Sequence, residues 1–209
     1  MNKLIVAVAS VFFFSVVGVQ AQNGPIATSV RVDKGQGIYG PMFATIGGRE
    51  QKITDQAQQA WILSGGRYVV YSSSEGAGGY ENEGQSLHVY DVVTRRHKRI
   101  MSQYFMVQTV EEVMTSKKKR ALLVTLEDGG LGASYVAVVD PSRGEVFFRR
   151  WARLLSRSGD TIVLGRYREG DWDKLMGEDA AKVRPYRTER YNLNALLLRR
   201  VIVNKSDRP

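Results

Sequence analysis

The sequence predicts a mainly β protein built from repeated antiparallel sheets, and three observations support this fold class. Short apolar runs recur along the chain, and each follows a cluster of turn-forming residues. Two of these runs are followed by a strand-like segment that ends in aspartate and leads into a tight turn. Glycine accounts for 21 of the 209 residues, which indicates many turns. Apolar runs of strand length that are bounded by turns and rich in β-branched residues are typical of buried strands.

The elements follow one another in a regular order. Residues 41–46 and 51–54 are predicted strands on either side of the turn Gly47-Gly48-Arg49-Glu50. Trp61 then precedes the turn at 64–67, and we expect it to be buried beside the strand that follows. Three apolar runs that begin 53 and then 40 residues apart form the predicted core, because burial of each Val or Leu stabilises the fold by roughly 1.5–3 kcal/mol. These runs are Tyr68–Tyr71, Ala121–Leu126 and Thr161–Leu164.

A second signal follows each of the first two runs. Leu87–Asp91 and Val136–Asp140 are both predicted strands that end in aspartate, and the two aspartates lie 49 residues apart. An aspartate side chain accepts hydrogen bonds from the backbone about two residues on, so each should begin a turn. A further strand follows each turn, at Lys98–Ile100 and Glu145–Phe148. Units of about 40–53 residues with several antiparallel strands each are typical of β-propeller blades.

Residues 61–100 resemble one repeat of the TolB-type periplasmic β-propeller. A repeat of that family has an aromatic residue, the sequence Ser-Pro-Asp-Gly, an apolar strand, small residues, a loop, and a strand that ends in Asp. In this chain Gly65 and Gly66 replace the Pro-Asp-Gly turn. The matching positions are Trp61, Ser64, Gly66, Tyr68–Tyr71 and Leu87–Asp91.

The resemblance extends more loosely over the next units. Residues 113–150 carry Lys117–Lys119 where the turn should be, and the unit from Leu155 keeps Ser158-Gly159-Asp160 but lacks the Asp-ended strand. The resemblance therefore covers 61–150 and implies a propeller-like protein of the periplasm.

The predicted fold is a small or incomplete β-propeller-like array of antiparallel sheets with a short C-terminal helix. A single domain over 22–209 would hold about three to four repeats, and a closed propeller needs at least four. A twisted open sheet, or a module completed by oligomerisation, also fits; Lys117–Lys119 would then protect an open edge. The near-helical spacing of Tyr191, Ala195 and Leu198 predicts the helix within 188–200, with Val201–Val203 as a strand after it.

The first 21 residues have the pattern of a secretory signal peptide. Lys3 precedes an apolar run from Leu4 to Val17, and Val19 and Ala21 are the small residues at positions −3 and −1 of a cleavage site. We therefore expect a periplasmic or secreted protein without a transmembrane anchor after cleavage. There is no cysteine, which excludes disulfides and thiolate chemistry, so the core alone must stabilise the fold.

Positive charge is concentrated in the last third of the chain. Residues 141–209 hold 16 Lys or Arg and 9 Asp or Glu, whereas residues 22–140 hold 13 and 12. Arginine and tyrosine alternate there in a way that could hold an anionic partner. The expected partner is another envelope protein or an anionic glycan or lipid surface, and not nucleic acid. The candidate binding residues are Arg184, Tyr186, Arg187, Arg190 and Tyr191.

Catalytic and metal-binding patterns are scarce. The two histidines are His88, expected as a polar residue on a strand, and His97, expected as an exposed turn residue. Loop carboxylates do not reproduce the spacing of a calcium loop. We therefore expect neither cofactor nor metal site and predict a non-enzymatic binding or scaffold protein. The alternative is a secreted hydrolase or lyase acting on a glycan with carboxylates, for which the candidates are Glu81, Glu83, Asp171 and Asp173.

Overall fold

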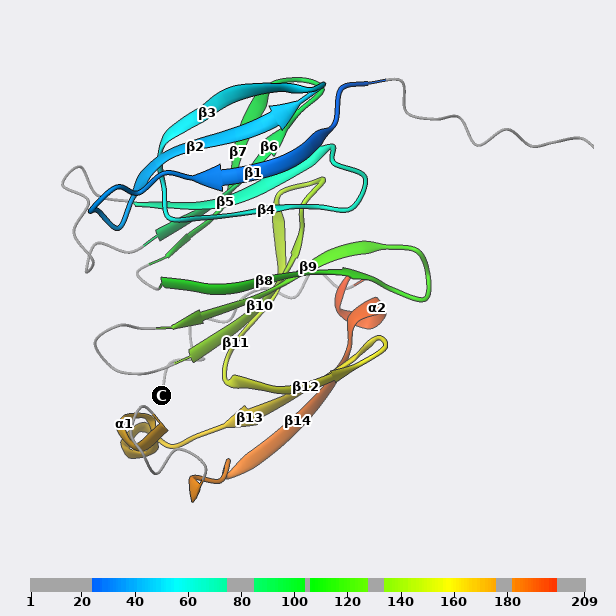
Figure 1. Ribbon diagram of the computed structural model, residues 1–209. Coiled ribbons are helices and arrows are strands. Elements are labelled where there is room, and N and C mark those ends of the chain that lie inside the picture. Colours follow the sequence, from blue (N-terminus) through cyan, green and yellow to red (C-terminus); the bar gives the residue numbers. More distant parts are fainter. Residues whose placement is uncertain (1–23, 75–84, 104–105, 128–133, 176–181, 199–209) are drawn as a thin grey trace, which may run out of the picture.

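Four antiparallel sheets are stacked one after another along the chain (Figure 1). The computed structural model describes residues 24–74, 85–103, 106–127, 134–175 and 182–198. Each sheet is a meander, since strands that are consecutive in sequence are neighbours in the sheet. The predicted fold class, a mainly β, propeller-like array of antiparallel sheets, is thereby confirmed. Among the described residues the first and last sheets do not pair with each other.

The two inner sheets have four strands each and the two outer sheets have three. Sheet 1 contains β1 (Ala27–Val32), β2 (Gly40–Ile46) and β3 (Arg49–Ala57). Sheet 2 contains β4 (Gln59–Ile62), β5 (Tyr68–Ser74), β6 (Gln85–Asp91) and β7 (Arg96–Gln103). Sheet 3 contains β8 (Met106–Met114), β9 (Arg120–Glu127), β10 (Ser134–Asp140) and β11 (Glu145–Trp151). Sheet 4 contains β12 (Arg153–Ser158), β13 (Thr161–Arg166) and β14 (Arg187–Asn192).

Short helical segments occur only near sheet 4 in the described part of the chain. A 3-10 turn at Glu169–Asp171 (η1) and helix α1 (Trp172–Leu175) lie between β13 and β14, and helix α2 (Leu193–Leu196) follows β14. The Asn192 side chain caps α2 by accepting a hydrogen bond from the Ala195 amide. None of these helices is long and apolar enough to cross a membrane.

The inner strands bury both of their faces, as their continuous apolar sequences predict. In β9, Leu122 and Val124 face sheet 2, whereas Ala121 and Leu123 face sheet 4. This alternation is the period of two that a pleated strand imposes on its side chains. The same division holds in β10, so sheet 3 carries apolar side chains on both sides.

Three apolar interfaces result, one between each pair of neighbouring sheets. Between sheets 1 and 2 the buried residues are Ala27, Met42, Ala44, Ile46, Ala57, Val69, Tyr71, Tyr90 and Val92. Between sheets 2 and 3 they include Val70, Leu87, Val89, Leu122, Val124, Tyr135 and Trp151, joined by Tyr167 and Trp172 from the segment after β13. Between sheets 3 and 4 they include Leu123, Val136, Val138, Phe148, Ile162, Leu164 and Leu193.

The predicted aspartate turns are present at equivalent places in sheets 2 and 3. Asp91 Oδ1 accepts hydrogen bonds from the amides of Val93 (2.9 Å) and Thr94 (3.3 Å). Asp140 Oδ1 accepts them from the amides of Ser142 (2.8 Å) and Arg143 (3.2 Å). Each aspartate ends the third strand of its sheet and starts the turn to the fourth, which confirms the repeated unit.

The structure differs from the sequence predictions in three places. The segment from Arg187 to Asn192 is a strand, and the predicted helix is limited to Leu193–Leu196, because β14 pairs along its whole length with β13. Trp61 is only half-buried, since β4 is an edge strand, although it does pack against the core between sheets 2 and 3. His97 is on β7 and not in a turn. The signal segment and Val201–Val203 lie outside the described residues.

A leucine inside an interface should contribute far more stability than one on an outer strand. Leu122 has no exposed surface, whereas 44% of Leu155 on β12 is exposed. Leu122→Ala should lower the free energy of unfolding by about 2–5 kcal/mol, because it opens a cavity between sheets 2 and 3. Leu155→Ala should lower it by less than about 1 kcal/mol. Denaturant unfolding of both variants tests this, and equal losses would contradict the assigned interfaces.

Candidate anion-binding surface

The five predicted binding residues lie on β14 or just before it. Arg184 and Tyr186 precede the strand, and the Tyr186 amide donates to the Arg166 carbonyl at the end of β13 (2.9 Å). Arg187, Arg190 and Tyr191 are on the strand itself. Tyr186 is 50% exposed, and Arg184, Arg187 and Arg190 are exposed.

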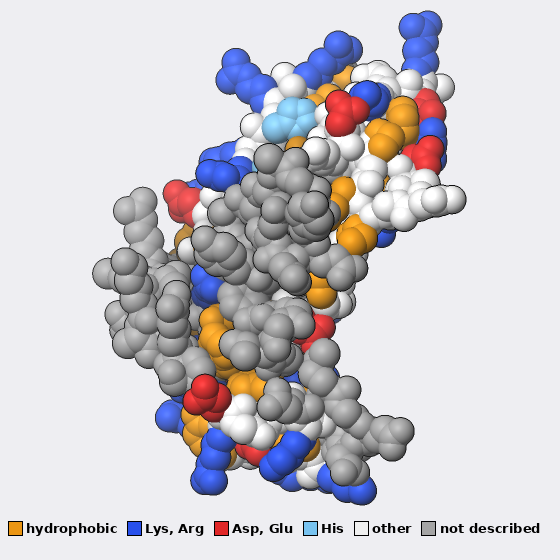
Figure 2. Space-filling model, turned by 90° about the vertical axis from the view of Figure 1, so that its left-hand side faces the viewer, with side chains coloured by type: hydrophobic (Ala, Val, Ile, Leu, Met, Phe, Trp, Pro, Cys, Tyr) orange, Lys and Arg blue, Asp and Glu red, His pale blue; other side chains and the backbone are white. Residues whose placement is uncertain are grey.

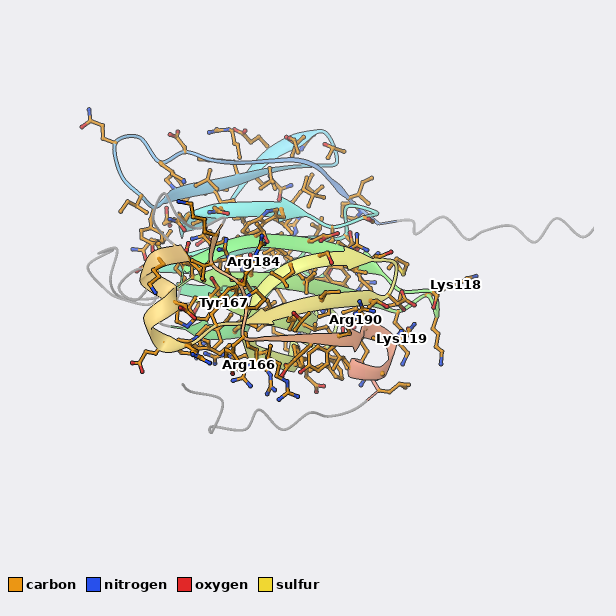
Figure 3. The ribbon with its side chains drawn as sticks, turned by 90° about the horizontal axis from the view of Figure 1, so that it is seen from below. Lys118, Lys119, Arg166, Tyr167, Arg184 and Arg190 are labelled. Atoms are coloured by element: carbon orange, nitrogen blue, oxygen red, sulfur yellow. The ribbon has the colours of Figure 1, made fainter. Side chains whose placement is uncertain are left out.

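The pleat of β14 divides these residues between two faces. Tyr191 packs on the ring of Phe148 from sheet 3 (centroids 4.7 Å apart), so Arg187 and Tyr191 share the face toward sheet 3. Arg190 belongs to the opposite face, and Figure 3 shows it away from Arg184 along the strand. The structure therefore brings Arg187 and Tyr191 together and places Arg190 apart from them.

Glu189, which sequence reasoning did not single out, is the centre of the inward-facing group. Its side chain is 7% exposed, and its two oxygens accept hydrogen bonds from Arg150 on β11 (3.1 and 3.2 Å). The Tyr191 hydroxyl donates to it at 2.6 Å, and the Arg187 guanidinium lies 3.2 Å away. Arg166 on β13 is at 3.9 Å. We call Arg150, Arg166, Arg187, Glu189 and Tyr191 the Glu189 cluster.

The surroundings of Glu189 favour its charged form. Burial raises the pKa of Glu189, but the hydrogen bonds from Arg150 and Tyr191 and the charges of Arg150 and Arg166 outweigh burial and hold it below its ordinary value. Burial, together with the hydrogen bond to Glu189, raises the pKa of Tyr191 to about 12. The carboxylate therefore stays ionised and the phenol stays neutral over the physiological range.

The Glu189 cluster holds more positive than negative charge. Arg166 and Arg187 carry about five N–H donors each, whereas the two oxygens of Glu189 already accept from Arg150 and Tyr191 and cannot accept from all the remaining donors. Arg187 retains a side chain that is 65% exposed. Planar guanidinium groups bind carboxylate, sulfate and phosphate oxygens through paired hydrogen bonds. The cluster is therefore preorganised to hold an added anionic group at its exposed side.

Sequence reasoning missed Arg150, Arg166 and Glu189 because their contacts join distant segments. Arg150 and Glu189 are 39 residues apart in the chain. One signal was available, since Arg187, Glu189 and Tyr191 alternate along one strand and must share a face.

The two histidines are in a different cluster, on the face of sheet 2 toward sheet 1. The Ser73 hydroxyl and His88 Nε2 are 2.9 Å apart, and the Tyr71 ring stacks on His88 with centroids 4.9 Å apart. The Tyr71 hydroxyl is 3.0 Å from His97 Nδ1. Burial raises the pKa of Tyr71 to about 12 and lowers that of His97. Tyr71 is buried, His88 is half-buried and His97 is exposed, and the contacts that join them are ring stacking and hydrogen bonds within sheet 2.

The carboxylates of the alternative enzymatic hypothesis are only partly described. Glu81 and Glu83 lie outside the described residues. Asp171 accepts from the Arg168 amide at 3.3 Å and lies 3.8 Å from the Lys174 ammonium. Within the described ranges, no three His, Asp or Glu side chains are grouped so that they could hold a metal ion.

Comparison with known proteins adds little beyond the architecture. No protein-family model matches the sequence, and no curated protein matches it. Eleven solved chains match in structure. One is the β-propeller domain of the trilobed protease from Pyrococcus furiosus, described as having an open velcro topology. It is 11% identical, with a TM-score of 0.42, and the match covers 68% of this chain and 48% of that one. The chain thus spans about half the length of that structure, and the fold assignment here depends on the sheets themselves.

Removal of the Glu189 charge should destabilise the protein and change its response to acid. The pKa of Glu189 is lower in the folded state than its unfolded value of about 4.5. The ionised side chain therefore stabilises the fold at every pH above about 4.5, and this stabilisation is lost as the pH falls through the lower folded pKa. Glu189→Gln should lower the free energy of unfolding at pH 7 by about 2–4 kcal/mol, because it leaves the arginines without their carboxylate.

The measurement is denaturant unfolding between pH 3 and pH 7. The variant should lose less stability on acidification than the parent, since one titrating group is gone. Glu145→Gln is the matched control, because Glu145 is exposed. Equal effects of the two substitutions would contradict the structural role of Glu189.

Proposed function

We propose that the protein is an exported, non-enzymatic binding protein of the cell envelope, similar in kind to TolB-type propellers, that holds an anionic partner on sheet 4. The observation that carries the proposal is that Arg166 and Arg187 lie beside a carboxylate that already accepts from Arg150 and Tyr191. The signal pattern of residues 1–21 and the TolB-like sequence of residues 61–100 support the envelope location.

Each residue of the surface has a definite part in this proposal. Arg187 and Arg166 present donors that Glu189 does not fully use, and Arg150 and Tyr191 fix the carboxylate that positions them. Arg184 and Tyr186 extend the surface beyond the start of β14, where the exposed Tyr186 ring can stack on a flat group of the partner. Arg190 contributes from the outer face of the strand. Lysine and arginine side chains are visible at the sheet 4 end of the molecule in Figure 2.

The partner is defined by its chemistry, as a polymer or surface that repeats carboxylate, sulfate or phosphate groups. An anionic envelope glycan, an acidic envelope protein and a lipid surface all meet this description. Several arginines acting together give an attraction that depends steeply on salt, because exposed charges are screened over about 8 Å at physiological ionic strength.

A charge-matched pair of variants tests the proposal. Arg184, Arg187 and Arg190 are replaced together by Ser in one variant. In the control, the replaced residues are at the other end of the array: Lys34 between β1 and β2, and Arg49 and Lys52 on β3. The parent should be retained on a heparin column and released at high salt. The sheet 4 variant should lose most of this retention while it stays folded, since Arg150 and Tyr191 still hold Glu189, whereas the control should keep the retention.

Equal retention of the two variants would show that net charge alone causes binding, and the proposed surface would then be wrong. Tyr186→Ala gives a second readout, because loss of a stacking contact should weaken retention at every salt concentration.

A further inference from the structure

A second cationic site lies at the opposite end of the strands. Consecutive antiparallel strands reverse direction, so alternate connections lie at the same end of the sheets. One end holds the short turns β4–β5, β6–β7, β8–β9, β10–β11 and β12–β13, and α1 lies at the other end (Figure 1). We call this end the turn rim. Its turns are joined across sheets: the Lys98 ammonium donates to the Arg143 carbonyl, and the Ser116 amide donates to Asp160 (3.0 Å).

A pocket of about 290 Å³ opens on the turn rim between sheet 3 and the end of α2. Three cationic side chains line it, Lys119, Arg120 and Arg143, together with the Ser142 hydroxyl. Phe147 and Leu197 form an apolar wall. Small-ligand pockets span about 300–1,000 Å³, so this one is at the lower end of that range and suits only a small group such as a headgroup or a small metabolite.

The carboxylates around the pocket are already engaged. Asp140 also lines it, but its Oδ1 accepts from the Ser142 amide and hydroxyl (2.8 and 2.6 Å) and from the Arg143 amide. Glu112 pairs with Arg120 at 2.8 Å. Asp160 accepts from Ser116 and from the Asn194 side chain.

Two cations are left without full neutralisation. The Arg143 guanidinium is 68% exposed and 3.8 Å from Asp140. For Lys119, the structure shows no carboxylate within ion-pair distance among the described residues. Lys119 and Arg143 supply two positive charges and Asp140 one negative charge, so the pocket keeps a positive excess that attracts a phosphate group, which is an anion at pH 7.

Backbone conformation supports a role for the basic turns. Lys118 has a φ of +55°, and its amide donates a hydrogen bond to the Thr115 carbonyl. In the equivalent turn of sheet 2, the Gly66 amide donates in the same way to the Leu63 carbonyl. Arg95 likewise has a φ of +55° at the position that Gly144 occupies in sheet 3. A left-handed conformation is costly for residues other than glycine. The chain thus retains long basic side chains on the turn rim at positions where glycine would be less strained (Figure 3 shows Lys118 and Lys119).

We propose that the pocket on the turn rim binds a phosphate group, held by Lys119 and Arg143, with the carbon part of the ligand against Phe147 and Leu197. Arg120 stays paired with Glu112, and the Ser142 hydroxyl stays with Asp140. This site is separate from the Glu189 cluster and does not depend on the function proposed for it. The phosphate belongs to a small soluble phosphate ester or to a phospholipid headgroup.

The test measures binding of two probes to the full chain. Glycerol 3-phosphate is titrated calorimetrically, and vesicles of phosphatidic acid in phosphatidylcholine are tested by co-sedimentation, with pure phosphatidylcholine as the blank. The Lys119→Ser/Arg143→Ser double variant should weaken binding by about tenfold or more, because it removes charge-assisted hydrogen bonds. Binding of glycerol 3-phosphate identifies a soluble ester as the source, whereas binding of the vesicles alone identifies a headgroup.

Two further variants make the result specific. Arg184→Ser/Arg187→Ser removes the same charge from the end of sheet 4 that is farthest from the turn rim and should leave phosphate binding within twofold, even though it weakens heparin retention. Lys118→Gly should raise the melting temperature, since it relieves the left-handed residue, so any loss of affinity in this variant comes from the side chain and not from unfolding.

The proposal is overturned if the parent binds neither probe, if the Lys119/Arg143 variant binds like the parent, or if the two double variants lose phosphate binding equally. Failure of the sheet 4 surface would appear separately, as unchanged heparin retention in the Arg184/Arg187/Arg190 variant.

Discussion

The structure depends on sheets whose inner members are apolar on both faces. β9 and β10 have no polar face to expose, so sheet 3 is stable only when it lies between sheets 2 and 4. Each outer sheet covers an inner sheet with one of its faces. The strands β3 and β12 of the outer sheets are largely exposed, and the neighbouring strands of the same sheets supply the apolar contacts. A stack of this kind ends where a sheet presents a polar outer face, as the terminal repeats of other repeat proteins do. The stacked architecture follows from this pattern of burial, without any disulfide.

Carboxylates in this protein act mainly as structural acceptors. Asp91 and Asp140 each close a turn, Asp160 binds the turn of the preceding sheet, and Glu189 joins β14 to β11. These four acidic side chains are therefore occupied within the fold, whereas the side chains of Arg187 and Arg143 are 65% and 68% exposed. The excess of positive charge at these two places is in this sense a consequence of how the turns and sheets are held together.

Local sequence predicted most of the strands and turns. It did not predict the features that depend on contacts between segments far apart in the chain. The runs Tyr68–Tyr71, Ala121–Leu126 and Thr161–Leu164 lie in β5, β9 and β13, because turn residues and apolar runs are local signals. The spacing of Tyr191, Ala195 and Leu198 predicted a helix within 188–200, yet pairing with β13 makes the residues up to Asn192 a strand. The partners of Glu189 and the lining of the turn-rim pocket come from segments far apart in the chain, so no local pattern indicated either. The five residues of the predicted surface were chosen by composition, and only the pleat shows that Arg190 faces away from Arg187.

The two cationic surfaces are well separated only at the start of β14. β14 runs from the Arg184 and Tyr186 end toward the turn rim, and six residues of a strand span about 20 Å. This distance is more than twice the screening length of about 8 Å at physiological ionic strength, so an anion beside Arg184 changes the potential at the turn rim only slightly. Arg190 is different, because it is two residues from Asn192, which pairs with Thr161 beside the β12–β13 turn. The charge of Arg190 can therefore act on both surfaces, whereas Arg184 and Tyr186 belong to the sheet 4 surface alone.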